Sequence, residues 1–450
     1  MGYDKSFFYR EDNLIGIGVL KGIKPAPFKL DKKGIYMNTT LTKQADKTNN
    51  HISHSSGTNI VNRCFSNIGP ESEVSVALQN LRWSMLDKNV NSLTLRSMET
   101  LFTTRLVARS GVVSELPKSQ SPMVVSYQFK GETYTTEDFL DRTYTNALLV
   151  MKNGVIVYEN YLNNMTPDTC HMGWSMTKSI VSTLIGMAYE EGRIHSLDDP
   201  IVNYIPELKN GAYNDVSIRH ILSMTSGVAY EERYDFDNPG LAATNHIKAI
   251  IKNVSRFADA AVDIKKKYEP GKVSEYKTID TAVLGWLLEK VLDGSNVSSY
   301  MAQKLWEPLG AEQNGFFIMD GTPEVGREFT GAGFNAILRD WARFGQMILN
   351  KGEFNGHKFI SSDYLEKATQ SFLPEHPETG GYGYQWWTFS GTNSFAAVGI
   401  LGQFVFIDPD TNTVIVKLSY CPTEEMDDIE KETELFLKAV SKWTVDEGSL

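Results

Sequence analysis

Short, mostly apolar runs flank turn residues in two regions of the chain, and both regions predict β-hairpins. In the first, residues 146–152 and 155–162 flank Asn153-Gly154, a pair that supplies the positive φ angles of a tight turn. In the second, residues 403–407 and 413–420 flank an Asp-Pro-Asp-Thr-Asn turn. Because one hairpin is early and the other is late, we expect one antiparallel sheet built from both ends of the chain.

The region between the hairpins has the period of amphipathic helices. Residues 179–194, 280–294 and 339–352 each repeat apolar positions on one helical face and reach a glycine near their end, as helices commonly do. A charged amphipathic segment, residues 424–445, follows the second hairpin. The pattern predicts an α+β fold, with a mixed antiparallel sheet flanked by helices and a large, mostly helical lobe.

The same pattern suggests how the chain is divided. Residues 1–120 are rich in Asn, Ser, Thr and Lys and show weak periodicity, so we expect an extension that wraps the main body. We expect residues 121–450 to form the main domain, with the helical lobe, about residues 185–385, inserted between strands of the sheet.

Composition narrows the classes of partner. With 44 basic and 55 acidic residues the net charge is −11, which argues against nucleic acid and anionic membranes. No run of 18 apolar residues and no secretory signal is found, and three cysteines are too few for a disulfide framework. We therefore expect a cytoplasmic protein with a small-molecule substrate. The oligomeric state is not indicated.

Ser175-Met176-Thr177-Lys178 opens the first predicted helix and forms an S-x-x-K motif. Residues three apart share a helical face, so the amine of Lys178 can reach the hydroxyl of Ser175 and take its proton. Lowering the pKa of a lysine from ~10.4 to about 7 requires roughly 4.6 kcal/mol, so this chemistry needs a buried amine. The alternative is an ordinary N-cap serine beside a solvated lysine.

A second S-x-x-K, residues 274–277, follows Pro270-Gly271 in a predicted loop, where nothing places its serine and lysine on one face. We do not expect it to hold the nucleophile. A Ser-His-Asp triad stays open as an alternative, because triads are assembled in space and the eight histidines are dispersed.

Several blocks in order resemble the serine β-lactamase and penicillin-binding-protein superfamily, most of all its class C-like branch with 6-aminohexanoate-dimer (nylon oligomer) hydrolases and related esterases. The resemblance covers about residues 146–418 and implies a β-lactamase/transpeptidase-like fold. The blocks are WSMTKS, LIGMAYEEGRI, LDDPIVNYIPEL, IRHILSMTSGV, YEPGKVSEYKTIDTAVLGWLLEKV, GAGFNAILRDWARFGQMILNKGEFNG, YGYQWW and GILGQFVFIDPDTNTVIV.

The resemblance implies roles for single residues. Ser175 matches the nucleophile, Lys178 its base, and Tyr276 the tyrosine that relays a proton to the leaving group. Thr278 stands where Asn or Ser is usual. The backbone N–H of Ile400, in a glycine-bearing strand, is expected to complete the oxyanion hole with that of Ser175.

The resemblance also suggests which residues border the substrate. We expect substrate-binding positions at Trp174, Tyr230, Tyr234, Thr278, Trp386, Gly399 and Leu401. Leu401 replaces the Lys or His that holds a carboxylate in many relatives, which argues against efficient β-lactam turnover. Acidic groups that bind a substrate amine in nylon-oligomer hydrolases have no clear match, because Ala229 and Gly331 stand where polar residues would help.

Together these observations predict a serine hydrolase that cleaves a carboxylic amide or ester through an acyl-enzyme, without a metal or organic cofactor. D-aminopeptidase and weak β-lactamase activities are alternatives within the same class. The competing class is a non-catalytic binding or scaffold protein on the same fold, since a fold does not determine a function.

Overall fold

Strands from both ends of the chain form one antiparallel sheet in the computed structural model, which describes residues 74–119, 121–234, 239–377 and 380–444. The seven strands lie in the order β11-β12-β13-β14-β15-β4-β5. Their bounds are Gly381–Tyr382 (β11), Trp387–Thr388 (β12), Phe395–Gly399 (β13), Gln403–Asp408 (β14), Thr413–Ser419 (β15), Thr145–Lys152 (β4) and Val155–Tyr161 (β5).

Both predicted hairpins are confirmed. β4 and β5 pair in antiparallel register, and Asn153 and Gly154 between them have φ values of 51° and 79°. β14 and β15 pair in the same way, and β15 also pairs with β4, which joins the two ends of the chain. This pairing of an early and a late hairpin is the sheet that the apolar pattern predicts.

Each face of this sheet is covered by helices, so its central strands are buried on both sides. On one face, Leu148 and Val150 of β4 pack with Phe436 of α13 (Met426–Lys442). On the other face, Leu149 of β4 belongs to the main core with Trp341 of α11 (Leu338–Leu349). Alternate residues of one strand therefore serve two different layers, as the pleat of a strand requires.

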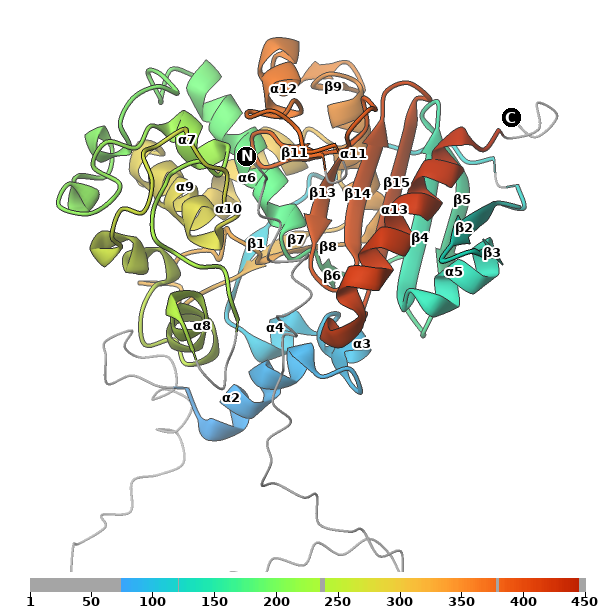
Figure 1. Ribbon diagram of the computed structural model, residues 1–450, viewed down its shortest axis with the longest axis horizontal. Helices are drawn as coiled ribbons and strands as arrows, with labels where there is room; N and C mark the ends of the chain where they lie inside the picture. Colours follow the sequence, from blue (N-terminus) through green and yellow to red (C-terminus); the bar gives the residue numbers. More distant parts are fainter. Residues whose placement is uncertain (1–73, 120, 235–238, 378–379, 445–450) are drawn as a thin grey trace, which may run out of the picture.

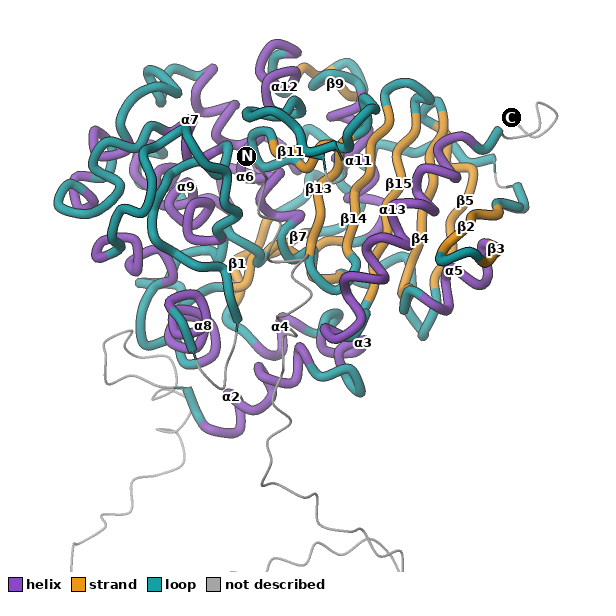
Figure 2. The backbone as a smooth tube through the Cα atoms, viewed as in Figure 1, coloured by secondary structure: helices purple, strands orange, loops and turns teal. Residues whose placement is uncertain are grey.

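The rest of the chain forms a mostly helical region beside the sheet, and α6 lies between the two (Figure 1). Figure 2 shows the contrast between the coiled region and the strands that run side by side. The α-helices of this region are α6 (Met176–Glu190), α7 (Ile218–Leu222), α8 (Leu241–His246), α9 (Thr278–Val291), α10 (Val297–Met301) and α12 (Ser362–Ala368). The short 3-10 and π segments are η2 (Ile201–Asn203), η3 (Pro206–Leu208), η4 (Ile247–Ile251), η5 (Phe257–Asp263) and η6 (Ala302–Trp306).

Residues 74–119 pack against this body. They form α2 (Val76–Trp83), η1 (Ser84–Leu86), α3 (Asn91–Thr94), α4 (Met98–Leu101) and β1 (Thr104–Val107). β1 is an edge strand of a second sheet, in the order β1-β7-β8-β6, with β7 (Gly315–Ile318), β8 (Phe334–Ala336) and β6 (His171–Met172). The remainder of the predicted extension, residues 1–73, lies outside the described residues.

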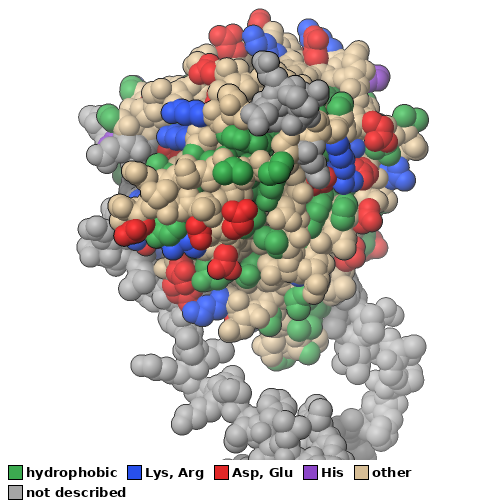
Figure 3. Space-filling view, turned by 90° about the vertical axis from the view of Figure 1, so that its right-hand side faces the viewer, with side chains coloured by type: hydrophobic (Ala, Val, Ile, Leu, Met, Phe, Trp, Pro, Cys, Tyr) green, Lys and Arg blue, Asp and Glu red, His purple; other side chains and the backbone are tan. Residues whose placement is uncertain are grey.

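Smaller elements complete the fold. They are β2 (Ser126–Phe129), β3 (Glu132–Thr135), α5 (Thr136–Arg142), β9 (Glu353–Phe354), β10 (His357–Lys358) and η7 (Thr423–Glu425). Acidic and basic side chains of the described residues are interspersed on the face that Figure 3 shows, so that face carries no large patch of one sign. Within the described residues, every helix is too short or too polar to cross a membrane.

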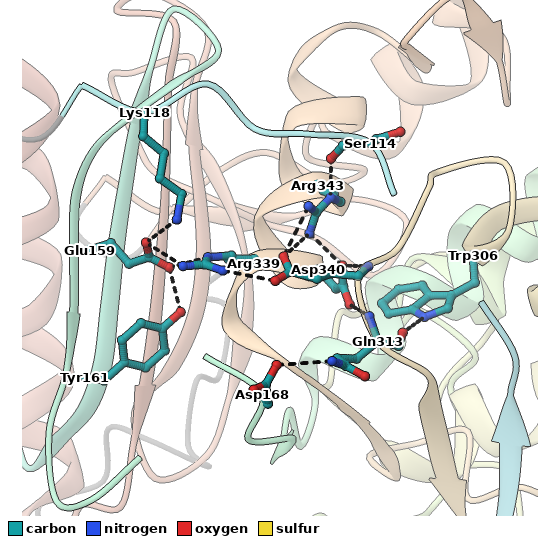
Figure 4. A network of polar contacts seen from close by, with 11 residues as sticks. Ser114, Lys118, Glu159, Tyr161, Asp168, Trp306, Gln313, Arg339, Asp340 and Arg343 are labelled. Carbon is teal, nitrogen blue, oxygen red and sulfur yellow. Dashed lines mark hydrogen bonds and ion pairs between the residues drawn. The ribbon is translucent and has the colours of Figure 1, made fainter. Parts of the chain in front are cut away.

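A network of charges, in part buried, connects α11 with distant parts of the chain (Figure 4). Arg339 donates to Glu159 of β5 (2.6 Å), and Glu159 also accepts from Lys118 (3.1 Å). One turn along α11, Arg343 donates to Asp340 (2.8 Å) and to the backbone oxygen of residue 114 (2.9 Å). The network thereby fastens the segment before β2 to the sheet and to α11.

Candidate active site

Ser175 stands at the N-terminus of α6, directly after a strained turn. Trp174 has φ of 46°, a left-handed conformation that is uncommon for a bulky residue and occurs mostly where the surrounding structure imposes it. Ser175 follows as the N-cap of α6, and its side chain lines a pocket between the sheet and the helical region. The turn therefore presents the hydroxyl to the pocket, where it can meet a ligand.

The amine of Lys178 is buried behind that hydroxyl. Its Nζ lies 2.9 Å from Oγ of Ser175, 3.2 Å from Oγ1 of Thr278 and 2.6 Å from the carbonyl oxygen of Gly331. Burial lowers the pKa of Lys178 to about 7, while the negative charge of Glu232 acts in the opposite direction. The S-x-x-K spacing thus has the geometry and the buried amine that the sequence predicts for it.

Tyr276 comes from the loop before α9, and its hydroxyl contacts Ser175. Burial raises the pKa of its hydroxyl well above the usual value, with the contact to Ser175 acting in the opposite direction. Its ring stacks on Trp387 with centroids 5.4 Å apart, and Nζ of Lys178 is 4.9 Å from the ring centroid. Tyr276 is therefore protonated at neutral pH and can donate.

The competing S-x-x-K does not assemble in this way. The amine of Lys277 pairs with the carboxylate of Glu275 at 2.9 Å, and both residues belong to the loop before α9. Nothing in the described residues directs this amine to Ser274. The loop position that the sequence indicates explains the difference, because only a helix places residues three apart on one face.

Glu232 is a site residue that the sequence reasoning missed. Its Oε2 accepts from the backbone N–H of Thr278 (2.8 Å), and its Oε1 accepts from the hydroxyl of Tyr234 (2.8 Å) and from that of Thr278. The carboxylate also lines the pocket. The only signal available was its place in a polar loop with several acidic residues, which does not distinguish it from Glu231.

The end of β13 approaches the nucleophile from the sheet. A Cβ on Gly399 would lie 3.1 Å from the backbone nitrogen of Ser175 and inside contact distance of the carbonyl oxygen of Gly173. Ile400 follows in the turn and lines the pocket. Among the described residues, the backbone N–H groups of Ser175 and Ile400 have no hydrogen-bond partner, so both are available to a ligand.

The pocket is small and mostly apolar, with a volume of about 70 Å³. Of the predicted substrate-binding residues, Trp174, Tyr234 and Thr278 line it, and Gly399 lies beside the nucleophile. The other lining residues are Leu86, Ser175, Glu232, His246, Tyr276, Phe329, Ala332, Ile400, Thr423 and Met426.

Three of the predicted substrate-binding residues do not reach this pocket. Trp386 is fully buried and stacks on Phe344, and Leu401 is fully buried in the core. Tyr230 is buried next to Asn245, whose amide donates to its hydroxyl at 3.4 Å. All three face the interior because their apolar surface packs in the main core.

The hydroxyl of Ser175 contacts an amine and a phenol, those of Lys178 and Tyr276. His246 lines the same pocket. His171, four residues before Ser175, bonds instead to Asn146 (3.2 Å) and the backbone oxygen of Met172 (3.0 Å). Among the described residues no group of three or more His, Cys, Asp or Glu residues could hold a metal ion.

Comparisons with known proteins show the family to which the chain belongs. A family model described as Beta-lactamase matches residues 136–439. The 6-aminohexanoate-dimer hydrolase of Paenarthrobacter ureafaciens is 30% identical over 303 residues, which cover 64% of this chain and 75% of that protein. Penicillin-binding protein 4 of Amycolatopsis lactamdurans is 26% identical over 153 residues, 33% of this chain and 37% of that protein.

The structural comparison extends over more of the chain. A solved structure from Bacillus anthracis, described as a candidate 6-aminohexanoate-dimer hydrolase, superposes with a TM-score of 0.70 at 24% identity. It covers 79% of this chain and 95% of the other. At this identity the likeness shows a shared fold.

Proposed function

The chain belongs to the beta-lactamase family and is a serine hydrolase of the amidase and esterase kind, and on this premise we propose that it cleaves a small, uncharged carboxylic ester or amide through an acyl-enzyme on Ser175. The observation that carries the proposal is the 2.9 Å contact between the Ser175 hydroxyl and the buried amine of Lys178.

The hydrogen bonds around Lys178 assign its protons. The hydroxyl of Thr278 donates to Glu232, so Thr278 accepts an N–H from Lys178, and the carbonyl of Gly331 can only accept. In the neutral amine these two acceptors use both N–H groups. The lone pair is then left for Ser175, which is the arrangement that a general base needs.

The reaction follows from these positions. Lys178 takes the hydroxyl proton of Ser175 as Oγ forms a bond to the substrate carbonyl carbon. Tyr276 donates its proton to the departing alcohol or amine as the carbonyl–heteroatom bond breaks, and recovers a proton from the Lys178 ammonium. Water then attacks the carbonyl carbon of the acyl-enzyme while Lys178 takes its proton. The bond between that carbon and Oγ of Ser175 breaks, Lys178 returns the proton to Oγ, and the acid leaves.

Two backbone donors are placed to stabilise the charge that develops on the carbonyl oxygen. The N–H groups of Ser175 and Ile400 border the pocket and lack partners in the described residues. Such a donor contributes about 3–4 kcal/mol to the transition state. We assign the oxyanion hole to this pair.

The size and the lining of the pocket favour a substrate with a small apolar acyl group. Its cavity of about 70 Å³ has mainly apolar walls, among them Phe329, Ala332 and Met426. Leu401 faces the core, so it offers no cation to a substrate carboxylate. The oxygens of Glu232 are already bonded to Thr278 and Tyr234, which disfavours a role as the partner of a substrate amine.

We also propose a cytoplasmic location and no nucleic-acid or membrane partner. Cys170 and Cys421 are free thiols, which fits a reducing compartment. The net charge of −11 supports the expected absence of polyanionic partners.

Intact-mass spectrometry tests the proposal directly. The wild type, Ser175→Ala and Ser274→Ala are exposed briefly to a fluorophosphonate, short-chain p-nitrophenyl esters and small amides. We expect an adduct on the wild type and on S274A, the matched control from the competing motif, and none on S175A. A folded wild type that no probe modifies would overturn the proposal and favour a binding protein.

A further inference from the structure

A buried glutamine, Gln403, lies inside the turn that carries the proposed oxyanion donor. It is the first residue of β14, opposite Gly399 in the hairpin register, and is fully buried. Its side-chain Nε2 lies 3.3 Å from the carbonyl oxygen of Ile400 and 2.9 Å from that of Leu401. One amide group thus contacts two successive carbonyls of a three-residue turn.

The same amide anchors this turn to the neighbouring strand. Nε2 is also 2.8 Å from the carbonyl oxygen of Ser419 in β15, and Oε1 accepts from the Ser419 N–H at 3.0 Å. Both ends of the Gln403 amide are therefore used, and all its bonds go to backbone groups. Other groups contribute weaker contacts: the N–H of Cys421 donates to the Leu401 carbonyl at 3.3 Å, and Nζ of Lys417 lies 3.5 Å from that of Gly402.

The backbone of the turn needs such support. Leu401 and Gly402 have φ values of 62° and 87°, so two successive residues are left-handed, and one of them carries a side chain. Their conformation points carbonyl groups into the turn, where an unpartnered carbonyl is costly. The orientation of the Ile400 N–H depends on this same backbone.

We propose that Gln403 is a positioning residue for the oxyanion hole: its side-chain amide fixes the Ile400–Gly402 turn so that the Ile400 N–H points at the carbonyl oxygen of the substrate. This inference rests on the proposed function, because it presupposes acylation of Ser175. Gln403 itself does not touch the pocket, and it acts only through the turn.

A general structural role would give a different result from a positioning role. If Gln403 only stabilised the sheet, its loss would lower the folded fraction, and each folded molecule would keep its activity. If it positions the Ile400 N–H, each folded molecule loses transition-state binding and keeps ground-state binding. The discriminating quantity is therefore kcat/KM per titrated active site.

The test compares Gln403→Met and Gln403→Asn with Gln346→Met, a control that removes another buried glutamine amide, on α11. Active sites are titrated with the fluorophosphonate. We expect kcat/KM for a p-nitrophenyl ester to fall about 10- to 100-fold in Q403M, less than the 10²–10³ for loss of a whole donor. Q403N, which keeps an amide on a shorter chain, should lie between Q403M and the wild type.

A tetrahedral mimic supplies the second readout. The inhibition constant of an alkyl boronic acid, whose adduct places an oxygen in the oxyanion hole, should weaken by the same factor as kcat/KM, with KM changed less than threefold. The acid limb of the pH profile should keep its midpoint, because Gln403 does not contact Lys178.

Two outcomes would overturn the inference, and neither resembles failure of the proposed function. In one, Q403M and Q346M keep the wild-type kcat/KM and boronate affinity per titrated site. In the other, kcat/KM falls and boronate affinity does not. A wild type that is not acylated at all would instead contradict the assignment of Ser175, and the titration reports that result before any variant is compared.

Discussion

At the scale of single residues, the proton on Lys178 determines how the reaction should depend on pH. The pKa of its amine is lowered to about 7 by burial, and only the neutral amine can accept the serine proton. Roughly a tenth of the amine is neutral at pH 6 and roughly nine tenths at pH 8. We expect the acylation rate to rise with pH through a midpoint near 7, measured by pre-steady-state ester hydrolysis.

An arginine at this position provides the control. Lys178→Arg keeps the positive charge but cannot lose its proton, because the pKa of a guanidinium is above about 12. We expect it to lose activity at every pH between 5 and 9. A rate that does not vary with pH in the wild type would argue that another group is the base.

Glu232 should influence both the plateau rate of acylation and the pH at which the rate reaches half of that plateau. Glu232→Gln removes the carboxylate that accepts from the backbone N–H and the hydroxyl of Thr278. The Thr278 hydroxyl, which accepts from Lys178, is then no longer fixed. We therefore expect the plateau rate of acylation to fall roughly tenfold. It also removes the negative charge that raises the pKa of Lys178. The acid limb should therefore move to lower pH, although the variant is slower.

Glu231→Gln is the matched control, because that carboxylate is exposed and pairs with Arg233 at 3.6 Å. It removes the same charge one residue away and should leave both the plateau and the midpoint unchanged. In the described residues, the titratable groups near the amine of Lys178 are Glu232 and Tyr276, and its neutral contacts are the hydroxyls of Ser175 and Thr278 and the carbonyl of Gly331. An acid limb in E232Q that stayed at the wild-type pH would contradict the assigned role of the carboxylate.

The sequence could indicate Ser175 and Lys178 because their chemistry depends on a local spacing along one helix. Tyr276 and Ile400 came from ordered blocks that resemble a known superfamily. Glu232 could not be predicted in this way, since its contact with Thr278 joins residues 46 positions apart. Aromatic type alone did not separate Tyr234, which lines the pocket, from Trp386, which packs in the core.

At the scale of elements, the site exists where the end of β13 meets the turn before α6. Gly399→Ala would place a Cβ 3.1 Å from the Ser175 nitrogen and inside contact with the Gly173 carbonyl, and both are backbone atoms. We expect the strand to shift, with kcat/KM at least tenfold lower. Overpacking of this kind destabilises by about 1–3 kcal/mol, which thermal denaturation measures.

Gly111→Ala serves as its control, because a Cβ there meets nothing within 4 Å. It should leave the melting temperature and kcat/KM close to those of the wild type. If G399A retained full activity, the end of β13 would accommodate a Cβ despite the short contact distances. That result would argue against Ile400 as a donor of the oxyanion hole.

The elements that the sequence predicted are those with long, regular patterns. The hairpins and the helices now labelled α6, α9, α11 and α13 extend over several turns or a full strand pair, so their periods are visible. β1, α3 and α4 have four residues each, too few to show a period, although β1 pairs with β7 over all four. Their structure comes from tertiary packing, which the sequence does not display locally.

At the scale of the whole molecule, the charge network of α11 couples regions that are distant in sequence. Arg343 and Asp340 form a buried pair at 2.8 Å, and Arg343 also donates to the backbone oxygen of residue 114. Removal of the arginine leaves the Asp340 carboxylate buried without a cation, with the backbone N–H groups of Glu312 and Gln313 as its remaining donors. We expect Arg343→Met to lower the free energy of unfolding by about 3–5 kcal/mol at pH 8.

The pH dependence of that loss follows from Asp340. Burial raises the pKa of its carboxyl to about 6, and Arg343 acts in the opposite direction, so R343M should raise this pKa further. A carboxyl with a raised folded-state pKa favours the folded state fully at low pH, and this contribution is lost as pH rises through the folded-state pKa. The destabilisation should therefore be smaller at pH 5 than at pH 8, as urea denaturation at both values would show.

Two further variants distinguish the effect of the buried charge on stability from the effect of lost packing contacts. Lys118→Met removes a partly exposed partner of Glu159 and should change stability by no more than about 1 kcal/mol. Asp340→Asn combined with R343M removes both charges and should recover part of the stability lost at pH 8, because no unpaired carboxylate remains. The double variant could instead be as unstable as R343M at both pH values. That result would show that the packing of the arginine, and not its charge, holds residue 114, the sheet and α11 together.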